Sequence, residues 1–206
     1  GALEAIGIDS SRLDVVLMQL VNLMKDGEPV RMSKRTGNAV TLVDLLDEVP
    51  IDAARFFFNM REPGSTIDFD LGLAVKEDSQ NPVYYCQYAN ARICSILRKM
   101  KEEGIEPRDC TEEELMLLNA PEERELIRHL SALTDEIITA AKDYDPARIT
   151  RYAVTLATLF HKFYNACRVG VDDEKLRAAR LYLCCRVKDV MGIILTEFKI
   201  TVPESM

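Results

Sequence analysis

Three cations stand within five residues in the segment Arg31-Met32-Ser33-Lys34-Arg35, which Gly37 follows closely. The surrounding sequence, EPVRMSKRTGNAV, is polar and has no helical or strand period, so we expect a surface loop. Such a loop suits phosphate binding, because lysine supplies a point charge, arginine supplies a bidentate fork, and serine and backbone N–H groups donate further hydrogen bonds. On spacing alone, a solvated basic turn is the alternative interpretation.

Aromatic, amide and basic side chains recur at helical spacing in two later segments. Tyr84, Tyr88 and Arg92 stand at i, i+4 and i+8 in the first. In the second, Arg148 and Tyr152 share a face, and His161, Tyr164, Asn165 and Arg168 follow at i, i+3, i+4 and i+7. Single-stranded RNA is bound by stacking its unpaired bases on aromatic rings while cations contact the phosphates. Tyrosines at this spacing are also typical of a half-buried core with a hydrated hydroxyl, so both interpretations stay open. The RNA-binding candidates are Tyr84, Gln87, Tyr88, Arg92, Arg148, Tyr152, Tyr164, Asn165 and Arg168.

Metal ligands do not cluster in the sequence. The six cysteines contain no CxxC pair, and the chain has two histidines. We therefore predict no metal site and no disulfide framework, and expect free thiols. Asp68 and Asp70 would face the same side of an extended segment, but without a third ligand we interpret them as structural.

The elements that must position the cationic loop form a predicted α/β unit. Residues 13–24 are nearly continuously apolar and end at Asp26-Gly27, which predicts a strand covered on both faces. After the loop, Thr41 and Asp44 predict a capping box that opens a short helix, which Pro50 ends, and Asp52 is the predicted cap of a second helix. The segment STIDFDLGLAV is expected to be extended.

The remainder of the chain predicts four long amphipathic helices. The first opens at Asn81-Pro82, and the others start at Pro121, Asp145-Pro146 and Asp172-Asp173. Four such helices with short connections are typical of an antiparallel bundle. The predicted fold class is mainly α, with a small α/β unit over residues 1–77 and an all-helical domain over residues 78–206.

The segment RMSKR is similar to the Lys-Met-Ser-Lys-Ser signature of class I aminoacyl-tRNA synthetases. Five blocks resemble, in order, consecutive blocks of the arginyl-tRNA synthetase family: DGEPVRMSKRTGNAVTLVDLLDEV, DAARFFFNMR, NPVYYCQYANARICSI, DPARITRYAVTLATLFHKFYNACRV and the terminal VPESM. The resemblance implies that residues 1–77 end a Rossmann-type catalytic domain and that residues 78–206 are a DALR-type anticodon-binding domain. We expect the rest of the catalytic domain, with its His-x-Gly-His signature, to lie upstream.

The family resemblance implies a ligase that activates arginine with ATP, as substrate with Mg²⁺, and transfers it to tRNA(Arg). Catalysis would consist of positioning and charge stabilisation, because both nucleophiles belong to substrates. Lys34 matches the second lysine of the signature and is the implied catalytic residue. The implied ATP-binding segment is Arg31, Met32, Ser33, Lys34 and Arg35, in which Arg31 and Arg35 replace the first lysine and the last serine of the signature. Met206 matches the C-terminus of the family and is a further implied tRNA contact.

The net charge of −8 at pH 7 disfavours binding of nucleic acid over the whole surface of the protein. Residues 146–206, however, carry ten basic and six acidic side chains, which is compatible with a local polyanion-binding surface. No apolar run approaches the roughly 20 residues of a membrane span. We therefore expect a cytoplasmic protein without a membrane segment.

Two other interpretations remain open. A cysteinyl-type synthetase has a similar domain order, but it would be expected to bring zinc ligands. The other alternative is a non-catalytic tRNA-binding or helical interaction module. We expect residues 1–206 alone to be catalytically inactive, since the adenine and arginine pockets would belong to the upstream domain.

Overall fold

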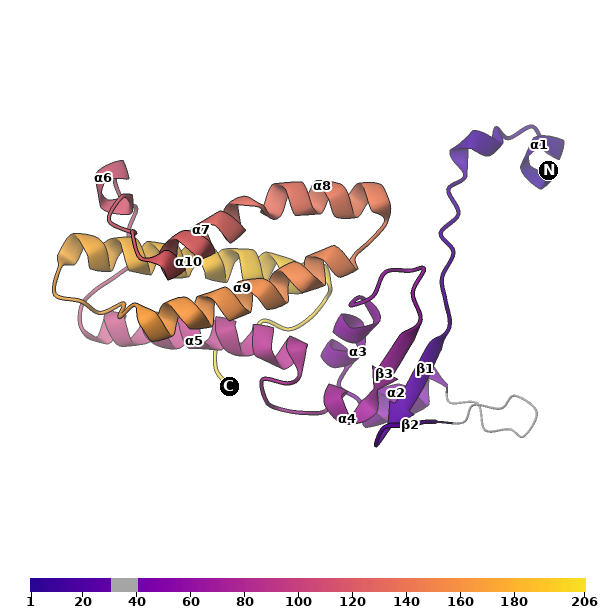
Figure 1. Ribbon diagram of the computed structural model, residues 1–206, viewed down its shortest axis with the longest axis horizontal. Helices are drawn as coiled ribbons and strands as arrows, with labels where there is room; N and C mark the ends of the chain where they lie inside the picture. Colours follow the sequence, from indigo (N-terminus) through magenta and orange to yellow (C-terminus); the bar gives the residue numbers. More distant parts are fainter. Residues whose placement is uncertain (31–40) are drawn as a thin grey trace.

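Ten α-helices, one 3₁₀ turn and a three-stranded sheet occupy residues 1–30 and 41–206, which the computed structural model describes. The predicted mainly α class is confirmed. Figure 1 shows a small α/β unit beside one end of a bundle of long helices. Buried apolar residues of both parts belong to one continuous core, in which Phe69 of the sheet and Phe160 of the bundle are fully buried. The boundary between residues 77 and 78 stays a prediction.

The sheet has the strand order β2-β1-β3, with β1 (Val21–Lys25) in the centre. β2 (Glu28–Pro29) pairs with it antiparallel, and β3 (Ile67–Asp70) pairs with it parallel, so that Leu23 lies opposite Phe69. Asp26 and Gly27 connect β1 to β2 with φ of 54° and 82°. Two successive positive φ values fit a tight hairpin turn, which is why the Asp-Gly pair is found there.

The prediction of a strand over residues 13–24 is wrong for residues 13–20. Only its last four residues belong to β1, and residues 13–20 form an extended arm with Leu17 80% and Leu20 83% exposed. The short helices α1 (Ala2–Ala5) and η1 (Ser10–Arg12) precede this arm (Figure 1). An apolar run becomes a strand only where a neighbouring strand pairs with it, and β3 reaches no further than Val21.

Short helices connect the strands. A capping box opens α2 (Leu42–Glu48) as predicted, because the Asp44 N–H donates to Thr41 Oγ1 at 3.2 Å and the Thr41 N–H donates to Asp44 Oδ2 at 2.7 Å. The predicted cap of α3 (Ile51–Phe58) is wrong, since this helix begins after Pro50.

The extended segment expected after α3 is confirmed only as far as β3. Asp70 there caps α4 (Leu71–Ala74), and its Oδ1 accepts a hydrogen bond from the Leu73 N–H at 3.0 Å. Asp68 accepts from Asn22 Nδ2 at 2.9 Å, across the β1–β3 pair. Both carboxylates thus have the structural role that the sequence indicates.

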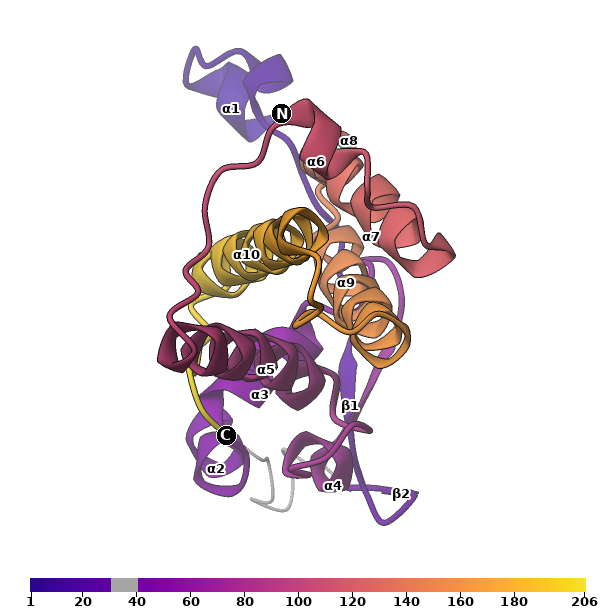
Figure 2. The ribbon, with the colours of Figure 1, turned by 90° about the vertical axis from the view of Figure 1, so that its left-hand side faces the viewer.

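The second part is an antiparallel arrangement of helices, seen nearly end-on in Figure 2. α9 packs against α5, α7, α8 and α10 and buries Leu156, Phe160 and Phe163 completely. Asn81 and Asp173 cap the first and last helices as predicted. The helices are α5 (Pro82–Glu102), α6 (Glu112–Leu115), α7 (Pro121–Ser131), α8 (Leu133–Asp143), α9 (Ala147–Ala166) and α10 (Glu174–Glu197).

The second predicted long helix is divided into α7 and α8 at Ala132. The backbone there stays near the helical region, at φ −80° and ψ −8°, but the axis changes direction (Figure 1). No glycine or proline marks the break in the sequence. The four-residue helix α6 in the acidic linker was likewise not predicted.

The C-terminal tail joins the α/β unit to the bundle. Asp52 of α3 accepts hydrogen bonds from Gln87 Nε2 of α5 at 3.0 Å, from the Thr201 N–H at 3.2 Å and from the Thr201 hydroxyl. Asn90 Nδ2 of α5 donates to the Pro203 carbonyl oxygen at 2.8 Å. One carboxylate therefore connects α3, α5 and the tail.

Asp52→Ala should lower the free energy of unfolding by about 1–3 kcal/mol, because three donors lose a charged acceptor. It should also speed hydrogen exchange in residues 199–206. Asp47→Ala, which removes an exposed carboxylate of the neighbouring helix α2, is the matched control. Urea denaturation and exchange mass spectrometry measure both effects, and equal behaviour of the two variants would contradict the role assigned to Asp52.

Candidate nucleic-acid interface

α5 and α9 leave a hollow of about 570 Å³ between them. Apart from Tyr85, the tyrosines, the arginine and the asparagine that line it are among the predicted RNA-binding residues, and the fold brings their two distant segments together. Packing of α5 against the buried face of α9 leaves their polar edges side by side. We call this surface the α5–α9 groove; its defining side chains are Tyr84, Tyr88, Arg92, His161, Tyr164 and Asn165.

Arg92 lies over the faces of two tyrosines in this groove. Its guanidinium carbon is 5.1 Å from the ring centroid of Tyr88 and 4.8 Å from that of Tyr164. Cation–π attraction and a hydrogen bond from Arg92 Nη2 to the Tyr88 hydroxyl hold the side chain there. The same hydrogen bond raises the pKa of Arg92, so the groove keeps its positive charge.

His161 lines the groove but was not among the predicted RNA contacts. Its ring centroid lies 4.8 Å from that of Tyr85 and 5.6 Å from that of Tyr88. Burial, followed by the charge of Arg92, lowers the pKa of His161, so the imidazole is neutral at pH 7. It stands three residues before Tyr164 in the sequence, so helical spacing already indicates that it shares the face of Tyr164.

The groove continues into a second hollow of about 500 Å³ toward the C-terminal end of α9. Tyr164 and Asn165 line both hollows, and the second adds two cations, Lys99 and Arg168, against one carboxylate, Glu103. Glu77 and Asp78 stand instead at the other end, beside Tyr84. The charge thus changes along the groove, and the end with Lys99 and Arg168 is the one that attracts phosphate.

Gln87 faces away from the α5–α9 groove. Its amide Nε2 donates to Asp52 and, at 3.1 Å, to the carbonyl oxygen of Thr201. The side chain therefore holds the C-terminal tail on α5, although it is one residue from Tyr88 in the sequence. We leave Gln87 out of the interface.

Arg148 and Tyr152 share a face of α9, as expected, but lie apart from the groove. They line another hollow, of about 240 Å³, and Tyr152 is roughly 18 Å from Tyr164 along the helix axis. Arg148 forms a salt bridge with Glu136 at 2.9 Å.

Tyr152 is 4% exposed and packs in the core. Its ring stacks on His129 with centroids 4.0 Å apart, and its hydroxyl donates to the His129 carbonyl oxygen at 2.9 Å. Burial, and then the charge of Glu136, raises the pKa of Tyr152 to about 12. A base cannot stack on this ring in the observed conformation, so we leave Tyr152 out of the interface as well.

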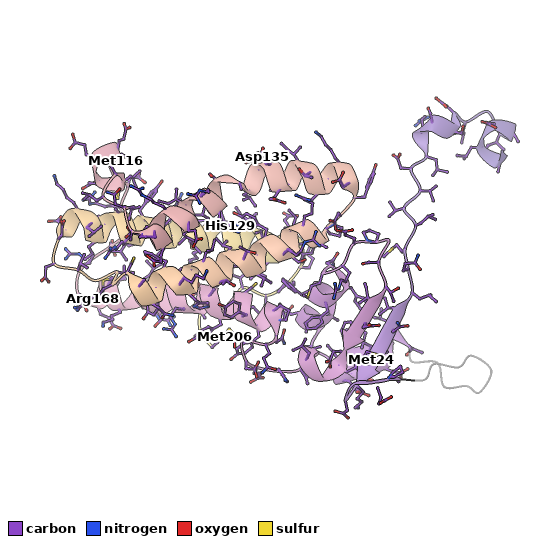
Figure 3. The ribbon with its side chains drawn as sticks, viewed as in Figure 1. Met24, Met116, His129, Asp135, Arg168 and Met206 are labelled. Carbon is purple, nitrogen blue, oxygen red and sulfur yellow. The ribbon has the colours of Figure 1, made fainter. Side chains whose placement is uncertain are left out.

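Met206 ends the tail that runs along α5, and its side chain is 51% exposed. Arg98 donates to the Glu204 carbonyl oxygen at 3.1 Å and fixes the tail two residues before the terminus. Figure 3 labels Met206 beside α5 and Arg168 near the end of α9. Met206 therefore lies against α5, the helix that supplies Tyr84, Tyr88 and Arg92, but on a face of α5 next to the one that carries these three residues.

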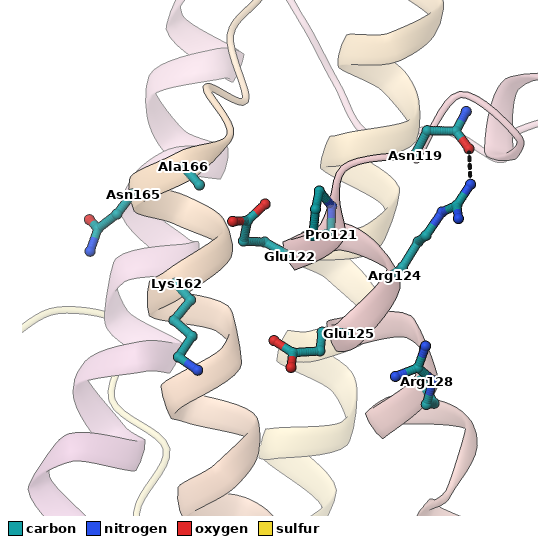
Figure 4. Close-up of a pocket in the computed structure, with 9 residues that line it drawn as sticks. All are labelled: Asn119, Pro121, Glu122, Arg124, Glu125, Arg128, Lys162, Asn165 and Ala166. Carbon is teal, nitrogen blue, oxygen red and sulfur yellow. Dashed lines mark hydrogen bonds between the residues drawn. The ribbon is translucent and has the colours of Figure 1, made fainter.

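A larger hollow, of about 840 Å³, lies on the other side of α9, against α7 (Figure 4). Glu122 and Glu125 line it together with Arg124, Arg128 and Lys162. Arg124 donates to Asn119 Oδ1 at 2.9 Å there. The described lining of this hollow contains no aromatic side chain, so, unlike the α5–α9 groove, it offers no ring on which an unpaired base could stack.

The cationic segment Arg31-Met32-Ser33-Lys34-Arg35 lies outside the described residues, so its assignment to ATP stays a prediction. Within the ranges 1–30 and 41–206, no three His, Cys, Asp or Glu side chains gather as metal ligands. No helix of the same ranges has the length and apolar character needed to cross a bilayer. The six cysteines form no disulfide.

Comparison with known proteins agrees with this geometry. Residues 86–206 match the DALR anticodon-binding domain family. The chain is 52% identical over 206 residues to an arginine–tRNA ligase of Caldanaerobacter subterraneus subsp. tengcongensis, a match that covers 100% of this chain and 37% of that relative. A solved Thermus thermophilus arginyl-tRNA synthetase superposes with a TM-score of 0.72 at 25% identity, over 89% of this chain and 34% of that chain.

A solved Campylobacter jejuni protein, described as an arginyl-tRNA synthetase, superposes with a TM-score of 0.82 at 30% identity and covers 100% of this chain and 44% of its own. The fold is thus a helical domain attached to an α/β unit, and the helical part carries the match to the DALR anticodon-binding domain family. The chain belongs to the DALR anticodon-binding domain family, and its curated relatives are arginine–tRNA ligases. It spans 37% of the length of those relatives.

Tyr152→Phe should lower the free energy of unfolding by about 1 kcal/mol, because the hydroxyl that donates to the His129 carbonyl oxygen is lost. The affinity for tRNA should not change, since the ring lies in the core. Urea denaturation and a filter-binding assay measure the two quantities. A several-fold loss of tRNA affinity, with the free energy of unfolding unchanged, would contradict this assignment and show that Tyr152 contacts tRNA.

Proposed function

We propose that this chain is part of an arginine–tRNA ligase and supplies the binding surface for the anticodon of tRNA(Arg). The observation that carries the proposal is the α5–α9 groove, in which Tyr88 and Tyr164 hold Arg92 between them within the segment that matches the DALR family. Aromatic faces beside a cation are suited to unpaired bases and their phosphates. Two curated relatives described as arginine–tRNA ligases are each 52% identical to this chain, which supports arginine as the amino acid.

The proposed reaction has two steps in the longer protein. The carboxylate of arginine attacks the α-phosphate of ATP, supplied as its Mg²⁺ complex, and pyrophosphate leaves; the arginyl group then passes to the terminal ribose of tRNA(Arg). Lys34 would contact the phosphates while negative charge builds on them, with Arg31, Met32, Ser33 and Arg35 completing the ATP-binding segment. No side chain needs to act as a nucleophile, so the role of this chain is positioning and charge stabilisation. We place the protein in the cytoplasm, where tRNA is charged.

Tyr164→Ala should weaken binding of tRNA(Arg) by about 5- to 150-fold, the range for loss of one stacked base, and should reduce the difference between the native and an altered anticodon. The matched control is Tyr182→Ala. Tyr182 likewise has an arginine over its ring, Arg186 at 4.9 Å, but this pair is on α10 and outside the groove. Filter binding with both tRNAs provides the measurement.

The interaction-module alternative gives a different result in that experiment. A helical module without anticodon recognition binds both tRNAs equally, before and after Tyr164→Ala. Anticodon-independent binding by the unaltered chain would therefore reject the proposed function.

Lys34→Ala in the full-length ligase should slow ATP–pyrophosphate exchange by roughly 30- to 1000-fold, equivalent to about 2–4 kcal/mol in the barrier, because one charge-assisted phosphate contact is lost. Binding of tRNA should be retained, since the groove is on another part of the chain. The control is Lys25→Ala, which removes an exposed lysine paired with Glu48. Unchanged exchange in the Lys34 variant would contradict the assignment of the loop to ATP.

A further inference from the structure

His161 carries a polar atom whose hydrogen-bonding capacity is not used. Its Nε2 atom is buried and has no partner in the part of the chain that the structure describes. A buried ring nitrogen is ordinarily bonded to protein or water, because burial without a partner is unfavourable. The ring cannot readily turn away from its position, since it packs against Tyr85, Tyr88 and Phe160.

The other histidine of the chain has the usual arrangement. His129 also stacks on a tyrosine, but its Nε2 donates to the carbonyl oxygen of Tyr152 at 3.0 Å. The two histidines therefore differ in whether the ring nitrogen is satisfied. They also differ in place, because His161 lines the α5–α9 groove whereas His129 lines the hollow beside Arg148.

Arg92 occupies the position beside His161 that a base could take. Its guanidinium is a flat group placed over the rings of Tyr88 and Tyr164, and a nucleobase is likewise flat and stacks on such rings. The arginine side chain is long and only partly buried, so it can turn toward solvent without unfolding α5. In doing so it would carry its charge toward a phosphate.

We infer that one unpaired base of the bound RNA replaces the Arg92 guanidinium between Tyr88 and Tyr164, and that His161 Nε2 then hydrogen-bonds an edge of that base. This inference rests on the proposed tRNA-binding function and adds to it a residue that determines specificity. A neutral imidazole nitrogen is either a donor or an acceptor. Nε2 consequently distinguishes a base edge that offers the complementary group from one that does not.

The test measures the affinity of the 206-residue chain for a tRNA(Arg) transcript and for transcripts in which each anticodon-loop base is replaced in turn. His161→Phe keeps an aromatic ring but removes both nitrogens. It should abolish the preference for one base at one loop position and lower the affinity for the native transcript by about 2- to 12-fold, the range for one neutral hydrogen bond. His161→Gln, which restores an amide near the position of Nε2, should recover part of that preference.

Thermal unfolding separates specificity from packing. His161→Phe should be at least as stable as the unaltered chain, because an unsatisfied buried atom is removed. His129→Phe, the matched control, should be less stable and should keep the full base preference. Retention of the base preference by both His161 variants would overturn the inference, and so would loss of Tm together with a uniform loss of affinity for every transcript. Failure of the unaltered chain to bind any transcript would instead reject the proposed function on which the inference rests.

Discussion

Burial of one face of α9 is the constraint on which the rest of the molecule depends. Leu156, Phe160 and Phe163 are fully buried where α5, α7 and α10 pack on this helix. With the apolar face fixed inside, the helical repeat places Tyr164 and its polar neighbours at the edge facing α5. The α5–α9 groove is therefore a consequence of core packing, and its aromatic side chains stand on two packed helices rather than on a loop.

The C-terminal tail gives this groove a fixed relation to the α/β unit. Asp52 accepts hydrogen bonds from both Gln87 and Thr201. The helix that carries Asp52, α3, packs against β3, and β3 pairs with β1 in the same continuous core. Residues 31–40 connect β2 to α2 in that unit. Under the proposed function, the phosphate-binding segment and the anticodon-binding surface thus belong to parts of the chain that are hydrogen-bonded to each other.

Local sequence signals predicted most of the helices, because capping residues such as Asn81, Thr41 and Asp173 act within one turn. They could not predict the division at Ala132 or the short β1, since these depend on what packs or pairs with the segment. The same limit applies to the site. Helical spacing puts Tyr88 and Tyr152 alike on helix faces that also carry polar residues. Only the tertiary fold shows that Tyr88 lines the groove whereas Tyr152 stacks on His129 in the core.

The central claim is that the α5–α9 groove holds the unpaired bases of the tRNA anticodon loop. Photocrosslinking measures this most directly, with tRNA(Arg) carrying a photoreactive base in that loop and the attached residues identified by mass spectrometry. We expect the photoreactive base to attach to α5 and to the C-terminal half of α9, at Tyr84, Tyr88 or Tyr164. Attachment confined to the α7 side of α9, around Arg124 and Lys162, would contradict it.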